Sequence, residues 1–345
     1  MEHDGLNSLT LERARTARVL VAITVHFNAN RLKFLAEVLR TLSDFPVAAM
    51  EIILVTNTLS DDKLAVLRRL CDEISPANRI SIRNHDYLAH PFNLTWSHRA
   101  IVAREFVKNN GGRYTHFIYL EDDIRLTFIN FCYFVEYRET LRDVGLLPSF
   151  LRVEYSSAFN GFVSSDNKAP VDMSHQSQLD AGETVMMNIP NPYIACYILD
   201  IALAAEFVRS PSFRRGKSRN VTEWDVRERA AMGLCFENVP DSFKSRYVVP
   251  ISKLTGTALS CTWISHLPNN YADDPNDGYG KIRMDSLFMN SRAPATVDQG
   301  NPELGTQLTG TTAKREPNPQ NRIDRYLILP NRIIEGLRWR LGLRR

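Results

Sequence analysis

Tyr114-Thr-His-Phe-Ile-Tyr-Leu-Glu-Asp-Asp-Ile124 is the stretch that decides the fold of this 345-residue chain. Its first part, Tyr114–Leu120, is mostly aromatic or β-branched, which is typical of a buried strand. The strand runs into three adjacent carboxylates, Glu121, Asp122 and Asp123. Like charges at the end of an apolar strand repel one another unless a positive charge lies among them. Two interpretations follow: a site for a divalent cation, which prefers carboxylate oxygens, or a solvated acidic turn that opens the next helix.

Composition and charge narrow the classes of protein that fit the chain. The sequence is 44% hydrophobic and 10% aromatic, which suits one large globular domain or a domain with an appendage. Its net charge of +3 is too small to indicate a nucleic-acid partner. Residues 321–345 hold seven arginines against Asp324 and Glu335, a net charge of +5, so the rest of the chain carries −2, the difference between +3 and +5. The basic character therefore belongs to the tail.

The cysteines and the N-terminal residues bear on the compartment. The five cysteines are widely spaced and form no Cys-x-x-Cys pair, so the sequence indicates neither a disulfide framework nor a zinc site. Met1–Arg18 is polar and charged, unlike a secretory signal, and the apolar run Val19–Val25 is too short to cross a bilayer. We therefore expect a protein of the reducing cytoplasm.

The first part of the chain alternates strands with helices. Apolar β-branched runs predict strands at 18–27, 51–55, 79–83 and 114–120, and apolar stripes at helical spacing predict helices at 31–42, 60–74 and about 95–109. This order predicts an α/β protein with a doubly wound, mostly parallel sheet, in which ligands bind beyond the carboxyl ends of the strands. Asn28, Asn57, Asp86 and the carboxylates 121–123 follow those ends. Their gathering on one edge favours the cation site over the solvated turn.

The part of the chain after Thr127 is less regular. The pattern predicts an aromatic helix after Thr127, strands at 151–155, 160–163, 193–199 and 247–251, helices at about 200–208 and 223–232, and a polar loop over 164–191. Residues 1–16 are expected to form a polar leader, and the Asp-, Asn-, Pro- and Gly-rich residues 271–320 a linker or surface wrap.

Several segments, in this order, resemble the GT-A fold glycosyltransferases, distantly those of the large family-2 type. In those enzymes a strand ends in an Asp-rich turn before a helix, as Thr56-Asn-Thr-Leu-Ser-Asp61 does here. A helix with an arginine follows, which Leu94–Arg99 resembles, and then a strand with a DXD-like triplet, which Glu121-Asp-Asp123 resembles. A later helix with an acidic pair, an arginine and a glycine is similar to Thr222–Gly233. The resemblance covers residues 18–235 and implies a GT-A-like sheet with an irregular C-terminal acceptor half.

The resemblance implies a metal site at the triplet. Asp123 is expected to coordinate Mn²⁺ or Mg²⁺, while Asp122 and Glu121 complete the shell or hold the ribose. The metal of such enzymes often takes a second ligand from a C-terminal histidine, and His266 is the candidate here. The alternative for His266 is a histidine that caps a turn.

The resemblance also implies nucleotide contacts. Asn28 and Asn57 follow the strands whose loops contact the nucleotide, with Asn57 where an aspartate often meets the base. Arg99 is expected to meet a phosphate or, alternatively, a surface carboxylate. For His98 a partly buried, hydrogen-bonded helix position is expected rather than catalysis.

An acceptor hydroxyl needs a base when the anomeric centre inverts. Glu223 and Asp225 are the candidates, and because they are two residues apart at a helix start they point to different faces. One of them is expected to reach the acceptor while the other binds a sugar hydroxyl or caps the helix. Carboxylates are also common at helix starts for dipole reasons alone.

Residues 321–345 form a basic tail with a helical pattern. Ile333, Ile334, Leu337 and Leu341 lie within one helical stripe, and several arginines lie elsewhere. This pattern predicts a helix on an anionic membrane surface, with docking on the enzyme's own body as the alternative.

Together these patterns predict a catalytic domain over 17–270, with a nucleotide-binding half at 17–125 and an acceptor half at 126–270. We expect a metal-dependent glycosyltransferase that moves a sugar from a nucleotide sugar, first of all a UDP-sugar, to a glycan or lipid-linked glycan. It would be cytoplasmic and peripheral to the inner face of the membrane. One alternative is a sugar nucleotidyltransferase, although the Gly-rich opening loop of that class is missing after the first strand. The other is a non-catalytic protein that binds membrane surfaces through its tail.

Overall fold

The computed structural model describes residues 6–74, 79–85, 87–218 and 224–289. The basic tail at 321–345, the 290–320 part of the expected linker, Glu223 and Asp86 lie outside these residues, and so do the predictions made for them. Among the described residues no helix combines the length and the apolar character needed to span a membrane.

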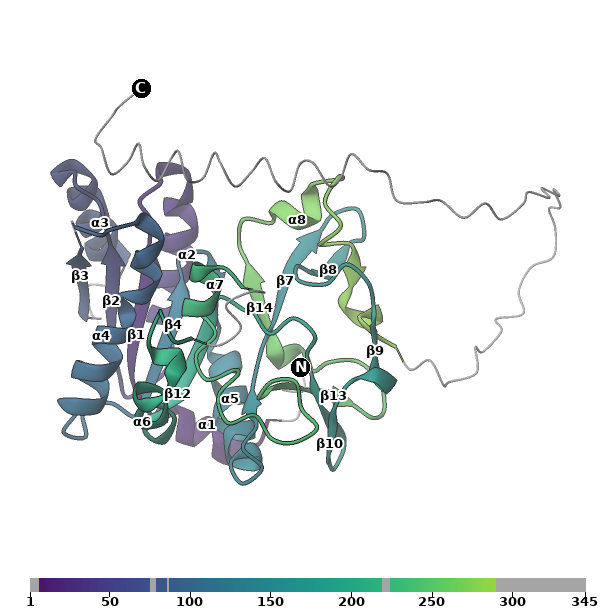
Figure 1. Ribbon diagram of the computed structural model, residues 1–345. Coiled ribbons are helices and arrows are strands. Elements are labelled where there is room, and N and C mark those ends of the chain that lie inside the picture. Colours follow the sequence, from purple (N-terminus) through teal and green to yellow (C-terminus); the bar gives the residue numbers. More distant parts are fainter. Residues whose placement is uncertain (1–5, 75–78, 86, 219–223, 290–345) are drawn as a thin grey trace. The chain divides into compact units, whose positions relative to one another are not determined.

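A five-stranded sheet with the order β12-β4-β1-β2-β3 underlies the first half (Figure 1). Its strands are β1 (Arg18–Val25), β2 (Ala49–Thr56), β3 (Arg79–Asn84), β4 (His116–Glu121) and β12 (Cys196–Asp200). β1 to β4 are parallel, and β12 runs antiparallel to β4. The predicted doubly wound, mostly parallel α/β sheet is therefore confirmed. β12 starts three residues later than the predicted 193–199 strand, because Ala195 takes a left-handed backbone conformation with φ of 53°.

Eight α-helices are found in the described residues: α1 (Ser8–Arg15), α2 (Leu32–Ser43), α3 (Asp61–Ile74), α4 (His98–Ile101), α5 (Phe128–Leu141), α6 (Ile201–Arg209), α7 (Val226–Ala230) and α8 (Asn270–Asp273). Residues 8–15, expected within a polar leader, form α1, because the Asn7 side chain caps the helix and its Thr10 and Ala14 are buried. The predicted helix at 95–109 is divided into a 3₁₀ segment at Pro91–Trp96, α4 and a π-helical segment at Val102–Lys108.

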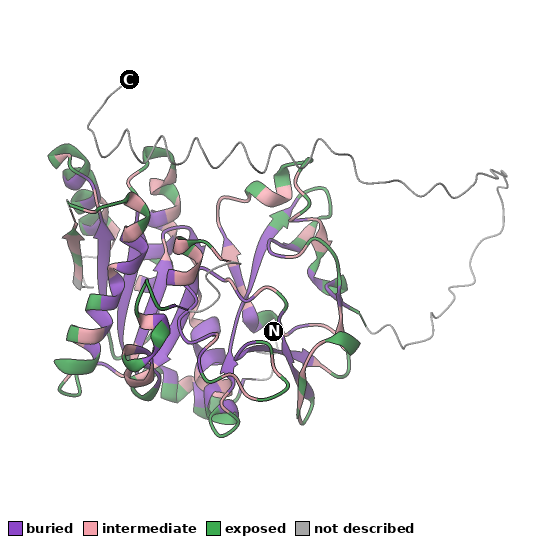
Figure 2. Cartoon of the chain, in the orientation of Figure 1, coloured by how far each residue is buried: buried purple, intermediate pink, exposed green. Residues whose placement is uncertain are grey.

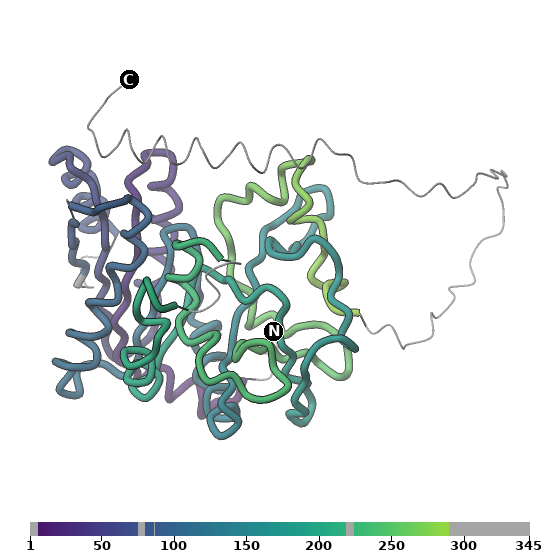
Figure 3. The backbone as a smooth tube through the Cα atoms, viewed as in Figure 1, coloured from purple at the N-terminus to yellow at the C-terminus, as the bar shows by residue number. Residues whose placement is uncertain are grey.

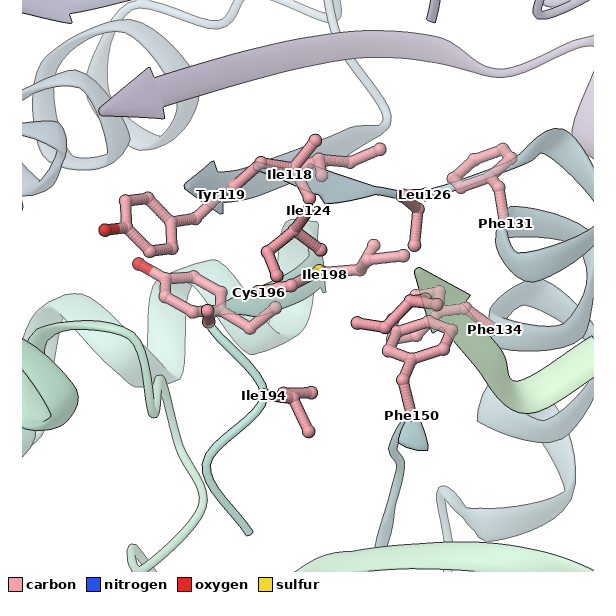
Figure 4. Close-up of a cluster of buried hydrophobic side chains, with 14 of the residues drawn as sticks. Ile118, Tyr119, Ile124, Leu126, Phe131, Phe134, Phe150, Ile194, Cys196 and Ile198 are labelled. Atoms are coloured by element: carbon pink, nitrogen blue, oxygen red, sulfur yellow. The ribbon is translucent and has the colours of Figure 1, made fainter. Parts of the chain in front are cut away.

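The hydrophobic core joins the sheet to α5. Figure 4 shows Ile118 of β4 and Ile198 of β12 in one cluster with Phe131 and Phe134 of α5. All four side chains are buried. Colouring by burial shows the central strands as buried and the outer turns of the helices as exposed (Figure 2). Burial of this apolar surface is the main free-energy source that holds the edge of the sheet, and the groups on it, in place.

The second half is built from smaller sheets, with strand orders β10-β11-β13-β6, β15-β8-β7-β14-β5 and β16-β9. The strands are β5 (Ile124–Arg125), β6 (Leu147–Pro148), β7 (Leu151–Ser156), β8 (Gly161–Ser164), β9 (Val171–Asp172), β10 (Gln178–Ala181), β11 (Thr184–Asn188), β13 (Tyr247–Ser252), β14 (Trp263–His266), β15 (Ile282–Arg283) and β16 (Phe288–Met289). In Figure 3 the teal and yellow-green backbone of β7, β8 and β14 lies beside the purple and blue backbone of the first sheet.

The segment 164–191 is not the loop that its polar sequence predicted. It contains β9 and the β10–β11 hairpin, which turns at Gly182, where φ is 71°. β11 then pairs with β13, so its Met186 and Met187 are buried. The polar residues of β10 gave no strand signal because β10 is an edge strand with largely exposed side chains.

Candidate active site

Strand register brings the predicted polar residues to one edge of the first sheet. Thr24 of β1 pairs with Glu121 of β4, and Val25 pairs with Thr56 of β2. Because these strands are parallel, the residues that follow each of them emerge on the same side. The 26–28, 57–58 and 122–123 segments therefore meet there.

The pairing of β14 with β5 carries His266 to the acidic triplet. β5 begins directly after Asp123, and His266 pairs with Ile124 across the two antiparallel strands. The backbone N–H of Leu267 donates to the carbonyl oxygen of Asp123 over 2.9 Å. As a result, Nε2 of His266 lies 3.5 Å from Oδ2 of Asp123, although 143 positions separate the two residues. The structure thus brings together the two residues predicted to bind a metal.

Glu154 fixes the imidazole of His266. Its Oε1 lies 2.5 Å from Nδ1 of His266, and its Oε2 accepts from the backbone N–H of Ala272 over 2.6 Å. Glu154 and His266 are both buried. A carboxylate that accepts from Nδ1–H is the arrangement by which proteins orient metal-binding histidines. Burial alone would lower the pKa of His266, but its hydrogen bonds to Asp123 and Glu154 raise it, so a cation at Nε2 would have to replace the proton shared with Asp123.

Arg31 lies against the same carboxylates. Its Nη2 donates to Oδ1 of Asp122 over 2.5 Å and to Oδ2 of Asp123 over 2.7 Å. Arg31 is the last residue of the 3₁₀ turn Ala29–Arg31, and the side chain of Asn28 caps the start of that turn. The sequence pattern did not identify Arg31, because it stands at the start of a predicted helix where a solvated arginine is ordinary.

The three carboxylates of the triplet differ in the direction of their pKa shifts. Burial, together with the charges of Asp123 and Asp122, raises the pKa of Glu121 to about 8. Burial and the Asp123 charge also raise the pKa of Asp122 above its usual value. Burial alone would raise the pKa of Asp123, but the hydrogen bond and charge of His266, with the charge of Arg31, hold it below its usual value. Asp123 is therefore the member of the triplet that stays ionised most readily.

Two adjoining cavities occupy this edge. The larger, of about 590 Å³, is lined by Asn28, Glu121, Asp122, Asp123 and His266 from the predicted set, and by residues that sequence reasoning missed, among them Arg31, Arg152, Tyr193, Arg227 and Glu228. The smaller, of about 450 Å³, is lined by Asn57, Thr58, Leu59, Ser60 and Lys63. His26 and Phe27 line both cavities, so the two form one elongated site.

Arg99 does not line either cavity. Its buried guanidinium donates to the backbone carbonyls of Ser212, Arg229 and Ala230 and stacks on Trp96, with 3.8 Å from Cζ to the ring centroid. These contacts use the donors that were expected to meet a phosphate. Arg99 thus joins α4 to the 3₁₀ segment Pro211–Phe213 and to the C-terminal end of α7, which is a structural role.

His98 is fully buried, more deeply than the partly buried position expected for it. Its Nδ1 lies 2.7 Å from the carbonyl oxygen of Thr95, and its Nε2 lies 2.6 Å from the hydroxyl of Tyr197. Burial lowers the pKa of His98 well below its usual value, so the ring is neutral. The prediction of a hydrogen-bonded helix histidine is confirmed.

Asp225 is the N-cap of α7. Its Oδ1 accepts from the backbone N–H groups of Arg227 and Glu228, and its Oδ2 pairs with the Arg227 guanidinium at 2.7 Å. Glu228 completes a capping box by accepting from the backbone N–H of Asp225 over 2.8 Å. Of these two carboxylates only Glu228 lines the larger cavity. The helix-capping alternative thus describes the contacts of Asp225.

The donor set at Asp123 and His266 fits a hard divalent cation. Within the part of the chain that the structure describes, no group of three or more His, Cys, Asp or Glu side chains is arranged to hold a metal by protein ligands alone. Mg²⁺, however, usually binds through one or two carboxylates and completes its shell with substrate phosphates and water. One ionised carboxylate, one oriented imidazole and an adjoining cavity meet that requirement.

No protein-family model and no curated protein matches the sequence. Among solved structures, the chain is similar to the mannosyltransferase PcManGT from Pyrobaculum calidifontis in complex with GDP-Man and Mn²⁺, at 17% identity over 44% of this chain and 44% of that chain, with a TM-score of 0.27. It is also similar to S. aureus TarS 1–349, at 13% identity over 55% of this chain and 48% of that one, with a TM-score of 0.30. The chain thus spans less than half the length of either protein. At such low scores the likeness adds nothing to the site, which rests on this chain's own residues.

Proposed function

We propose that the protein transfers a sugar from a nucleotide sugar to a hydroxyl of a glycan or lipid-linked glycan, with a divalent cation held by Asp123 and His266. The observation that carries the proposal is the 3.5 Å approach of Oδ2 of Asp123 to Nε2 of His266, with Glu154 behind the imidazole. This pair lies beyond the carboxyl ends of parallel strands, where α/β sheets bind nucleotides.

The shape and charge of the paired cavities support a nucleoside diphosphate sugar. The smaller cavity, with Asn57 and Ser60, offers polar groups for the nucleoside, and the larger one holds the carboxylates and arginines. A cation at Asp123 would neutralise the charge that develops on the leaving diphosphate. Arg31 and Arg227 line the same cavity and add positive charge near that group. Tyr193 and Glu228 line the same cavity, which would also hold the sugar.

We further propose Glu228 as the base that takes the proton of the acceptor hydroxyl. In the transfer, the acceptor oxygen forms a bond to the anomeric carbon, the bond from that carbon to the diphosphate breaks, and the acceptor proton passes to a carboxylate. Both carboxylates belong to the capping box, but Glu228 lines the cavity, whereas Asp225 does not line it and pairs with Arg227. Glu228 is therefore favoured over Asp225 for this role.

Turnover of a panel of nucleotide sugars, measured as release of the nucleoside diphosphate with Mn²⁺ present, tests the function. Asp123→Asn is expected to remove turnover while the protein stays folded. Turnover retained in this variant would contradict the metal assignment.

A matched pair of substitutions tests the base. Gln at 228 and Asn at 225 both preserve the helix cap, because amides cap helices and complete capping boxes as carboxylates do. Glu228→Gln is expected to lower turnover by roughly 10²- to 10⁴-fold, the usual contribution of a general base, and Asp225→Asn to retain most of it. The opposite ranking would assign the proton transfer to Asp225.

A further inference from the structure

One oxygen of Asp123 serves two positively charged partners. Oδ2 accepts a hydrogen bond from Nη2 of Arg31 at 2.7 Å and lies 3.5 Å from Nε2 of His266. The same Nη2 also reaches Oδ1 of Asp122 at 2.5 Å. Arg31 therefore bridges the two aspartates and occupies the oxygen of Asp123 that a cation held by Asp123 and His266 would use.

A divalent cation and this guanidinium compete for the oxygen. A divalent cation on Oδ2 would bind the lone pairs that accept the hydrogen bond from Arg31. It would also bring two positive charges next to the positive charge of the Arg31 guanidinium. In a buried site the repulsion between neighbouring like charges is much stronger than in water. Binding of the cation at Asp123 is therefore expected to displace Arg31 from Oδ2.

The guanidinium of Arg31 could bind another partner within the same cavity. Its side chain lines the larger cavity and remains 38% exposed, so its end is not locked in the core. Its Nε is buried and has no hydrogen-bond partner among the residues that the structure describes. A guanidinium with a spare donor matches the paired oxygens of a phosphate, which it binds in a planar, two-bonded geometry.

We propose that Arg31 exchanges partners as the donor binds: it bridges Asp122 and Asp123 before binding, and it moves to the diphosphate when a cation takes Oδ2 of Asp123. This inference rests on the proposed function of the cavity. Its consequence is a coupling between ligands, since Arg31 opposes the cation alone and favours the nucleotide once the cation is bound. Arg31 thereby couples binding of the cation to binding of the nucleotide.

Calorimetric titration of the full chain separates these two effects. The first titration uses Mn²⁺ alone, and the second uses UDP or GDP at saturating Mn²⁺, each with the wild type and with Arg31→Gln. Arg125→Gln is the matched control. Arg125 follows the triplet closely and is 37% exposed, pairs with Glu37 at 3.2 Å and is not among the residues that line the cavity. The Arg125→Gln substitution removes one positive charge, as Arg31→Gln does, but leaves the contacts of Arg31 with Asp122 and Asp123 in place.

Arg31→Gln is expected to bind Mn²⁺ alone about tenfold more tightly and the nucleotide at saturating Mn²⁺ about tenfold more weakly, as loss of a charge-assisted hydrogen bond implies. Arg125→Gln is expected to change both affinities less than about twofold, as an exposed pair does. Unchanged or weaker Mn²⁺ binding in Arg31→Gln, or an equal gain in Arg125→Gln, overturns the exchange. If the wild type binds neither nucleotide, the proposed function fails, and the Mn²⁺ titration alone decides whether Arg31 competes with the cation.

Discussion

Replacement of Glu154 by Gln tests whether the imidazole of His266 is positioned for a metal. The buried carboxylate accepts two hydrogen bonds, from Nδ1 of His266 at 2.5 Å and from the backbone N–H of Ala272 at 2.6 Å. Gln offers one acceptor and one donor where the site requires two acceptors. In one orientation its amide donates to Nδ1 and forces the proton onto Nε2, which removes the metal-binding lone pair. In the other orientation the amide NH₂ group faces the backbone N–H of Ala272, so two donors oppose each other and the N–H of Ala272 loses its acceptor.

The magnitude follows from these contacts. Loss of a hydrogen bond to a charged group costs about 2 kcal/mol, so the unfolding free energy of Glu154→Gln is expected to fall by about that amount. Removal of a group that orients a metal-binding histidine typically lowers metal affinity by about 10- to 100-fold. The first orientation predicts the upper end of that range, since Nε2 is then protonated.

Urea unfolding and Mn²⁺ titration, performed on the same preparation, measure the two effects. Glu37→Gln is the control, because Glu37 pairs with Arg125 at 3.2 Å and is 41% exposed. This control is expected to leave both quantities nearly unchanged. Wild-type Mn²⁺ affinity in a folded Glu154→Gln protein would refute the reasoning that Glu154 prepares His266 for a metal.

Three further predictions concern the framework of the site. Burial lowers the pKa of His116 to about 4, from an ordinary 6.5. The unfolded chain therefore binds a proton at a higher pH than the folded protein does. The free energy of unfolding keeps its full value above pH 6.5 and falls by about 3 kcal/mol as the pH falls to 4. His116→Leu should flatten this part of the pH–stability curve, and identical curves would contradict it. Arg99→Met is expected to cost about 3 kcal/mol in urea unfolding because three backbone carbonyls lose a charged donor, while an unchanged unfolding free energy would reject the structural role. Gly280→Ala is expected to lower the unfolding free energy by about 2 kcal/mol, since φ is +68° and the new Cβ would lie 2.5 Å from the carbonyl carbon of Tyr271; unaltered thermal melting would argue against this.

The first half of the fold could be predicted because each of its elements carries a local signal. β1, β2 and β4 are apolar, β-branched runs, and the polar residues at their ends had to meet once the strands were taken as parallel. α1 and the β10–β11 hairpin gave no such signal. They are held by long-range contacts, the packing of α1 on α5 and the pairing of β11 with β13, which a local pattern does not contain.

The candidate metal ligands could be named from the sequence, whereas the residues around them were not identified from it. Asp123 could be named from residue type and position, and His266 from the resemblance to the GT-A fold enzymes. Arg152 and Glu154 carried a signal that went unused, because two charged residues alternate with apolar ones in β7, and a charge on a buried strand needs a partner. Arg31 could not have been found in this way. Its role depends on the direction of a long side chain at the start of a helix, which only the packed structure determines.

A thermal-shift measurement with UDP and GDP, each with and without Mn²⁺, on the wild type and Asp123→Asn, tests the central claim most directly. A ligand that binds only the native state at a hundred times its dissociation constant adds about 2.7 kcal/mol of stability. The proposed site predicts a rise in melting temperature for the wild type with at least one nucleotide, only when Mn²⁺ is present, and no rise for Asp123→Asn. A nucleotide shift that is equal without Mn²⁺ or equal in Asp123→Asn, or no shift with either nucleotide, would contradict it.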